Sequence, residues 1–171
     1  MAHVKRRLAV PAASLVLLLS LTLFLRVDTV TVRLPREENR LFGAVRVTSE
    51  SEVVLRYRHS VEKTRVEGVF VIGPGPVLQA KLTRMTSVGT GLPNTQTART
   101  RRERQWLVVD EELATVPGFD FFISTVNATQ LAVDGTAIAV EHLASGSVIH
   151  IDVERVRLLE WILWHYGGMD W

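Results

Sequence analysis

The sequence predicts a mainly β protein: an antiparallel β-sandwich or barrel of about seven to eight strands, with an N-terminal transmembrane helix and a short C-terminal amphipathic helix. The first observation is that short runs rich in apolar and β-branched residues recur from residue 28 onward, separated by turn-forming segments. The second is a long uncharged stretch near the N-terminus, and the third is an aromatic tail at the C-terminus. The 171 residues suffice for one domain with its own core.

The N-terminal stretch predicts a membrane anchor. Residues 8–25 carry no charge and follow a basic tail, residues 1–7, that contains Lys5, Arg6 and Arg7. As a helix these 18 residues would span about 27 Å, close to the hydrocarbon thickness of a bilayer. The positive-inside rule places the basic tail in the cytoplasm and the chain from residue 28 outside it. We therefore expect a single-pass protein of the cell membrane, with its anchor over residues 8–27 and a periplasmic domain.

The alternative to an anchor is a cleaved signal peptide. Such peptides have the same basic start, but small residues precede their cleavage site. Here Leu23, Phe24 and Leu25 occupy the corresponding positions. We therefore favour an uncleaved signal anchor, and either interpretation exports the domain.

Composition excludes several classes of function. The chain has no cysteine, which removes disulfides, thiolate metal sites and a lipidated cysteine anchor. Without the three basic residues of the tail, 17 basic residues face 18 acidic ones, so the exported part is close to neutral and we expect no nucleic-acid binding. The local basic cluster formed by Arg99, Arg101, Arg102 and Arg104 is interpreted as a solvated loop.

The exported domain is expected to cover residues 28–155. Its third predicted strand places Tyr57 and His59 on one face and Ser60 on the other, because side chains alternate along a strand. Asp134 and Gly135 predict a tight hairpin turn. The predicted strands cover residues 28–34, 41–47, 51–61, 65–73, 77–89, 130–135, 136–143 and 147–156.

The C-terminal tail, residues 156–171, has a different character. It contains three of the four tryptophans and one of the two tyrosines, namely Trp161, Trp164, Trp171 and Tyr166. As a helix it is too short and too charged for a second membrane span, but its tryptophans suit a membrane interface or a groove on a partner. The alternative is a terminal helix or strand that caps the β core.

Catalytic, metal and cofactor sites are not indicated. Neighbouring residues on a strand point to opposite faces, so His59 and Ser60 cannot form a serine–histidine pair without a bend. The five histidines do not occur at a spacing that places two of them on one face of one element. The glycine-rich segments lack the lysine and serine or threonine of a phosphate-binding loop, so we expect no cofactor.

Two short segments carry a family resemblance. The first contains Tyr57, His59, Ser60, Val61, Val66 and Glu67, and the second contains Gly89, Gly91, Leu92 and Pro93. This pattern resembles the domain-of-unknown-function family eighteen-fifty, which comprises small exported β proteins of bacteria and archaea. The order and spacing of the predicted strands extend the resemblance over residues 28–155. Two features depart from the family pattern: Arg65 occupies a position where members often have proline, and the aromatic tail has no counterpart in the family core.

The resemblance implies a partnership and not a reaction. Members are commonly encoded beside, or fused to, permeases of TAXI-type tripartite ATP-independent periplasmic (TRAP) transporters. It therefore implies a non-enzymatic, membrane-anchored accessory protein that acts at the extracytoplasmic face of such a permease. The alternative is a periplasmic module that binds a small ligand or metal in a pocket around Tyr57, His59 and Glu67.

Overall fold

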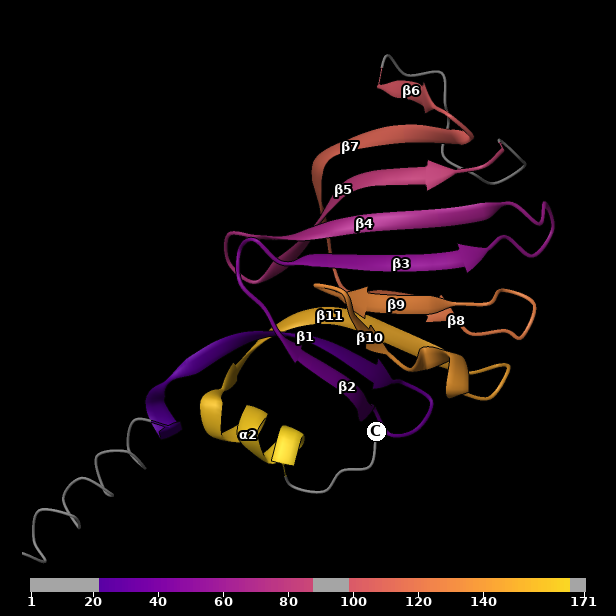
Figure 1. Ribbon diagram of the computed structural model, residues 1–171. Helices are drawn as coiled ribbons and strands as arrows, with labels where there is room; N and C mark the ends of the chain where they lie inside the picture. Colours follow the sequence, from indigo (N-terminus) through magenta and orange to yellow (C-terminus); the bar gives the residue numbers. More distant parts are fainter. Residues whose placement is uncertain (1–21, 88–98, 167–171) are drawn as a thin grey trace, which may run out of the picture. The chain divides into compact units, whose positions relative to one another are not determined.

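The computed structural model describes residues 22–87 and 99–166, and it confirms a mainly β fold with two antiparallel sheets (Figure 1). The first sheet has four strands in the order β2-β1-β11-β8. Its strands are β1 (Arg26–Leu34), β2 (Arg40–Arg46), β8 (Phe119–Phe122) and β11 (Val148–Arg157).

The second sheet has seven strands in the order β10-β9-β3-β4-β5-β7-β6, and every neighbouring pair is antiparallel. Its strands are β3 (Glu52–Arg58), β4 (Arg65–Gly73), β5 (Val77–Met85), β6 (Thr100–Glu103), β7 (Trp106–Val116), β9 (Gln130–Val133) and β10 (Thr136–Ile138).

The hydrophobic core lies between the two sheets, as expected for a sandwich. Tyr57 of β3 meets Phe121 of β8 edge to face with ring centroids 5.1 Å apart, and Phe70 of β4 stacks on Phe119 of β8 at 5.3 Å. Gly43 fits this packing because a Cβ there would lie 2.8 Å from Cγ2 of Ile138. Fully buried members of the core include Val30, Val32, Leu34, Val53, Leu131, Val133, Ile149 and Ile151.

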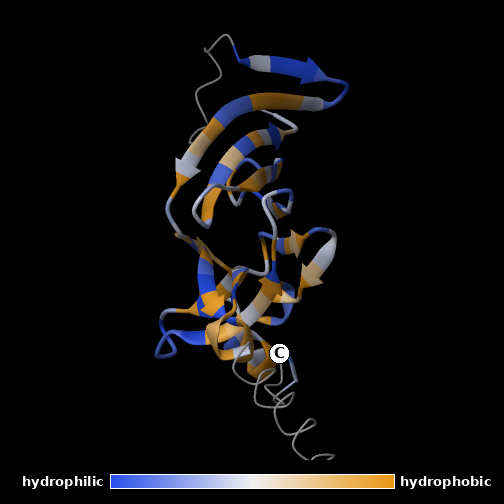
Figure 2. Cartoon of the chain, turned by 90° about the vertical axis from the view of Figure 1, so that its left-hand side faces the viewer, coloured by the Kyte–Doolittle hydropathy of each residue, from blue (hydrophilic) through white to orange (hydrophobic). Residues whose placement is uncertain are grey.

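Three strands, β6, β7 and β8, were absent from the sequence prediction. β7 is hard to detect because Glu112 and Leu113 adopt φ values of 51° and 56°, and its pairing with β5 shifts register between Ala80 and Leu82. Such a bulge bends the strand and breaks the alternation that marks it in the sequence. Figure 2 shows β6 as hydrophilic along most of its length, which also hides it from a search for apolar runs.

Two predicted strands are shorter than expected. β3 ends at Arg58, and the chain turns at His59, whose N–H donates to Thr64 O at 2.8 Å. Val61 lies in this turn with 74% of its surface exposed, so the strand predicted over residues 51–61 ends early, and the prediction that His59 shares a strand face with Tyr57 is wrong. The segment 136–143 forms β10 followed by a 3₁₀ helix, η1 (Val140–His142), in place of one continuous strand.

Of the described residues, 28–87 and 99–154 form one compact unit, and 22–27 and 155–166 belong to another. Within the second unit, helix α2 (Leu158–Tyr166) begins where the N–H of Leu158 donates to Leu25 O at 2.8 Å. Its first turn is capped by the Glu160 carboxylate, which accepts from the N–H of Arg157 at 3.1 Å. Of the predicted tail, the first two residues complete β11 and Leu158–Tyr166 form α2; the residues beyond 166 lie outside the described part.

No helix in the described part of the chain is both long and apolar enough to cross a membrane. The predicted anchor falls mainly on residues 8–21, which lie outside the described residues.

An ion pair links β1 to β11 on the solvent side of the four-stranded sheet. Arg33 donates from Nε to Oε1 of Glu154 at 2.8 Å and from Nη2 to Oε2 at 3.0 Å, and the Thr31 hydroxyl donates to Oε1 at 2.9 Å. The hydrogen bond with Arg33 lowers the pKa of Glu154 against the opposing effect of burial, and it raises the pKa of Arg33. Both shifts favour the charged pair.

We expect Glu154→Gln to lower the free energy of unfolding by about 1 kcal/mol at neutral pH. Because the pKa of Glu154 is lower in the folded chain than in the unfolded chain, the stabilisation is complete above the ordinary glutamate pKa and disappears as pH falls through the folded value. The difference between wild type and variant should therefore shrink below about pH 4 in urea titrations. Glu37→Gln, which removes an exposed pair with Arg40, is the control, and equal pH profiles for both variants would contradict the prediction.

Candidate functional site

The candidate site lies on the face of the seven-stranded sheet that points away from the core. Val53 and Leu55 of β3 enter the core, so Arg56 and Arg58 lie on the opposite face, which we call the outer face. Cα pairing places one residue of each of six strands in a single row across this face. The row runs through Gln130, Arg56, Glu67, Arg84, Val108 and Arg101.

Glu67 is the centre of this row and is nearly buried, with 8% of its surface exposed. Its Oε2 accepts from Nε of Arg56 at 2.6 Å, and its Oε1 accepts from Nη1 of Arg84 at 2.8 Å. The two arginines belong to the strands on either side, β3 and β5. One carboxylate therefore joins three strands through two charge-assisted hydrogen bonds.

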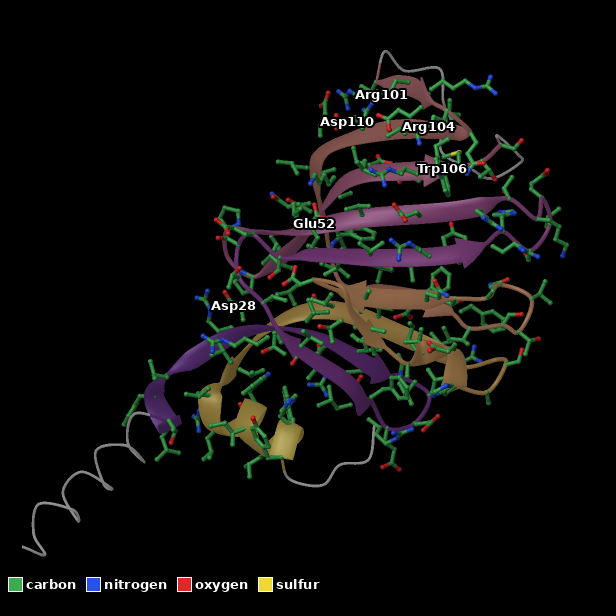
Figure 3. The ribbon with its side chains drawn as sticks, in the orientation of Figure 1. Asp28, Glu52, Arg101, Arg104, Trp106 and Asp110 are labelled. Atoms are coloured by element: carbon green, nitrogen blue, oxygen red, sulfur yellow. The ribbon has the colours of Figure 1, made fainter. Side chains whose placement is uncertain are left out.

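A half-open cavity of about 330 Å³ adjoins this cluster. Figure 3 shows Trp106 at the end of the sheet opposite Glu52; because β3 starts at Glu52, its last residue, Arg58, lies at the Trp106 end. The polar and aromatic residues that line the cavity are Arg56, Arg58, Arg65, Glu67, Trp106 and Gln130. Tyr57, Val66 and Ala128 complete its walls.

Arg58 and Arg65 are direct partners in the pairing of β3 with β4. Both are exposed, and neither side chain forms an ion pair or a side-chain hydrogen bond with the described residues. Like charges at opposed positions on neighbouring strands destabilise a sheet. The cavity thus combines three arginines with one carboxylate that is already engaged twice.

The electrostatic environment of the cavity is positive. Burial raises the pKa of the Tyr57 phenol, which therefore stays neutral at physiological pH and adds no negative charge beside the arginines. Guanidinium groups bind carboxylates and phosphates through paired hydrogen bonds, and an indole ring offers an apolar surface. This set of groups is suited to binding an anion.

The sequence-predicted site residues do not all meet at this cavity. Tyr57 and Glu67 line it, whereas His59 lies in the turn after β3, where its Nδ1 accepts a hydrogen bond from the N–H of Glu62 at 3.4 Å. His59 therefore does not join Tyr57 and Glu67 at the cavity, and the oxygens of Glu67 accept from Arg56 and Arg84. Ser60 is exposed in the same turn.

The remaining predicted residues lie elsewhere. Trp161 and Trp164 are half-buried in α2, and Tyr166 is exposed at its end. Trp171 and the second family motif fall outside the described residues; that motif comprises Gly89, Gly91, Leu92 and Pro93. In the basic cluster, Arg99 pairs with Glu112 and Arg101 with Glu103, the latter at 2.7 Å, which fits a solvated surface.

A second hollow, of about 470 Å³, lies on the four-stranded sheet and was not anticipated from the sequence. In the sequence, this hollow could have been found from His150, Asp152 and Glu154, which occur at every second position and so lie on one face of β11. His150 Nδ1 lies 2.6 Å from Oδ1 of Asp120. Among the described residues, neither this group nor any other set of three or more histidine, aspartate or glutamate side chains has an arrangement that could hold a metal ion. Glu154 is already held by Arg33, so we interpret this hollow as a surface ion network.

We expect Glu67→Gln to lower the free energy of unfolding by about 2 kcal/mol, because it leaves Arg56 and Arg84 without their shared carboxylate. The control is Glu52→Gln on the same sheet, which removes an exposed ion pair with Lys81 and should cost about 0.5 kcal/mol. Urea unfolding of both variants measures the difference. Equal losses would show that burial of Glu67 adds nothing to its ion pairs.

Comparison with known proteins supports the family resemblance. Residues 53–140, just over half of the chain, match a family model described as a domain of unknown function, DUF1850. The match is narrower than the expected residues 28–155, but it includes every residue that lines the cavity. No curated protein and no solved structure shows a significant match to the chain. The chain therefore belongs to the DUF1850 family.

Proposed function

We propose that this chain is a membrane-anchored, non-enzymatic accessory protein of a TAXI-type TRAP transporter, with its β unit on the extracytoplasmic side of the permease. The family resemblance implies the partner, and the predicted anchor over residues 8–27 implies the location. The observation that carries the proposal is the hydrogen bond from Leu158 to Leu25, because it joins the start of the aromatic helix to the end of the predicted anchor.

The surface around this junction suits a membrane interface or an apolar partner. Phe24 has 84% of its surface exposed, and Leu163 and Tyr166 of α2 have 54% and 76% exposed. No residue of α2 is buried, although the helix contains two tryptophans. Tryptophan and tyrosine side chains gather where one end of the ring is apolar and the other is hydrated, as at the headgroup level of a bilayer. A permease that emerges from the same bilayer would meet α2 at this level.

The proposal predicts that the tagged full-length chain copurifies with a TAXI-type permease from membranes solubilised in a mild detergent. Leu163→Ser combined with Tyr166→Ser should reduce the recovered permease about tenfold or more, because two exposed apolar side chains would no longer be covered. Quantitative immunoblotting of the eluate measures this loss.

Leu113→Ser combined with Phe122→Ser is the matched control, since it removes an exposed leucine and an exposed aromatic residue from the β unit. The control should retain the permease. If the tagged wild-type chain is recovered alone under conditions that keep the permease intact, the accessory role is refuted.

The alternative, a ligand-binding module, draws support from the outer-face cavity. Its metal-binding form does not, since no group of three or more histidine, aspartate or glutamate side chains among the described residues is arranged so that it could hold a metal ion. A small-molecule form is compatible with the accessory role, because a periplasmic subunit can bind both a solute and a permease.

A further inference from the structure

The outer-face cavity carries positive charge that the described residues do not neutralise. Arg58 and Arg65 face each other as direct strand partners, and their guanidinium groups have no acidic partner among the described side chains. Two like charges at opposed positions lower the stability of the sheet when no ligand is bound between them. The arrangement becomes favourable when one anion accepts hydrogen bonds from both groups.

Glu67 does not serve as that anion. Its two oxygens accept from Arg56 at 2.6 Å and from Arg84 at 2.8 Å, and neither oxygen forms an ion pair with Arg58 or Arg65. Glu67 instead holds Arg56 in place on the cavity wall. Arg58 and Arg65 are therefore available to a ligand, whereas Arg56 contributes a positive charge whose position is fixed by Glu67.

The rest of the wall defines the body of the ligand. Trp106 is the first residue of β7 and pairs with Glu103 across the short turn of the β6–β7 hairpin, so the backbone that carries its indole is fixed. The amide of Gln130, which shares the outer face with Arg56, adds one polar group. A volume of about 330 Å³ lies at the lower end of the range for small-molecule sites.

We propose that this cavity binds a small organic carboxylate, with Arg58 and Arg65 sharing the carboxylate group and the apolar or aromatic body lying against Trp106. A guanidinium group matches a planar carboxylate in charge and geometry, and the lone pairs of the two oxygens can accept from more than one donor. The site requires no permease and stands independently of the transporter role.

The test is isothermal titration calorimetry of the full-length chain in a non-ionic detergent at low ionic strength, with three probes of matched size or charge. Benzoate carries both the carboxylate and the ring, benzamide lacks the charge, and acetate lacks the ring. Benzoate should bind about tenfold more tightly than either of the others, since each of them loses one of the two contacts. Equal affinity for benzoate and benzamide, or heat of binding from none of the three, would overturn the proposal.

The variant Arg58→Ala with Arg65→Ala should weaken benzoate binding about tenfold or more. Arg46→Ala with Arg102→Ala is the matched control: it removes the same two charges from exposed positions that do not line the cavity, and it should change the affinity less than about twofold. Equal weakening in both variants would mean that net charge, and not this site, attracts the probe.

A thermal-unfolding measurement separates binding from folding. Removal of Arg58 and Arg65 relieves a repulsion, so the unliganded variant should unfold at the wild-type temperature or above it. Benzoate should raise the unfolding temperature of the wild type and of the control, but not that of the Arg58→Ala Arg65→Ala variant. A variant that responds to benzoate like the wild type would refute the assignment of these two arginines.

Discussion

The two hydrogen bonds of the Glu67 carboxylate hold together the strands on which the candidate site is built. Three neighbouring strands, β3, β4 and β5, each contribute one charged group to this cluster, and the carboxylate is nearly removed from solvent. A buried charge is tolerated only when it is fully paired, so the register of these strands is specified by the ion cluster as well as by the core. A shift of one residue would move Glu67 toward the apolar core and leave Arg56 and Arg84 unpaired.

The same strands carry an apolar face that is specified independently. Tyr57 and Val66 are strand partners on this face, and Tyr57 contacts Phe121 of the other sheet. The strands that carry Arg58 and Arg65 are therefore fixed on one face by the packing of Tyr57 against Phe121 and on the other face by the ion pairs of Glu67. Rigid support of this kind lowers the entropy lost when a ligand orders the site.

The β class and most of the strands could be predicted because their side chains alternate with a period of two, as in β3 and β11. β7 could not, because the bulge at Glu112 and Leu113 interrupts the alternation. Tyr57 and Glu67 could be assigned to a common hairpin from sequence, but the partner of Glu67 could not. His59 lies in the turn after Arg58 and not in the strand, and Arg84 reaches Glu67 from β5, a strand whose pairing register a single sequence does not specify.

The opposed arginines connect the stability of the unit with its proposed binding. Substituting either Arg58 or Arg65 by a neutral residue would relieve the repulsion between them, so stability alone does not account for both charges. Groups that repel in the empty site and attract a common ligand increase the difference in free energy between the free and bound states. Functional sites commonly lower stability in this way, because the residues that suit a ligand are not those that suit the fold. The positive cavity is thus more readily explained by an anionic partner than by the requirements of the sheet.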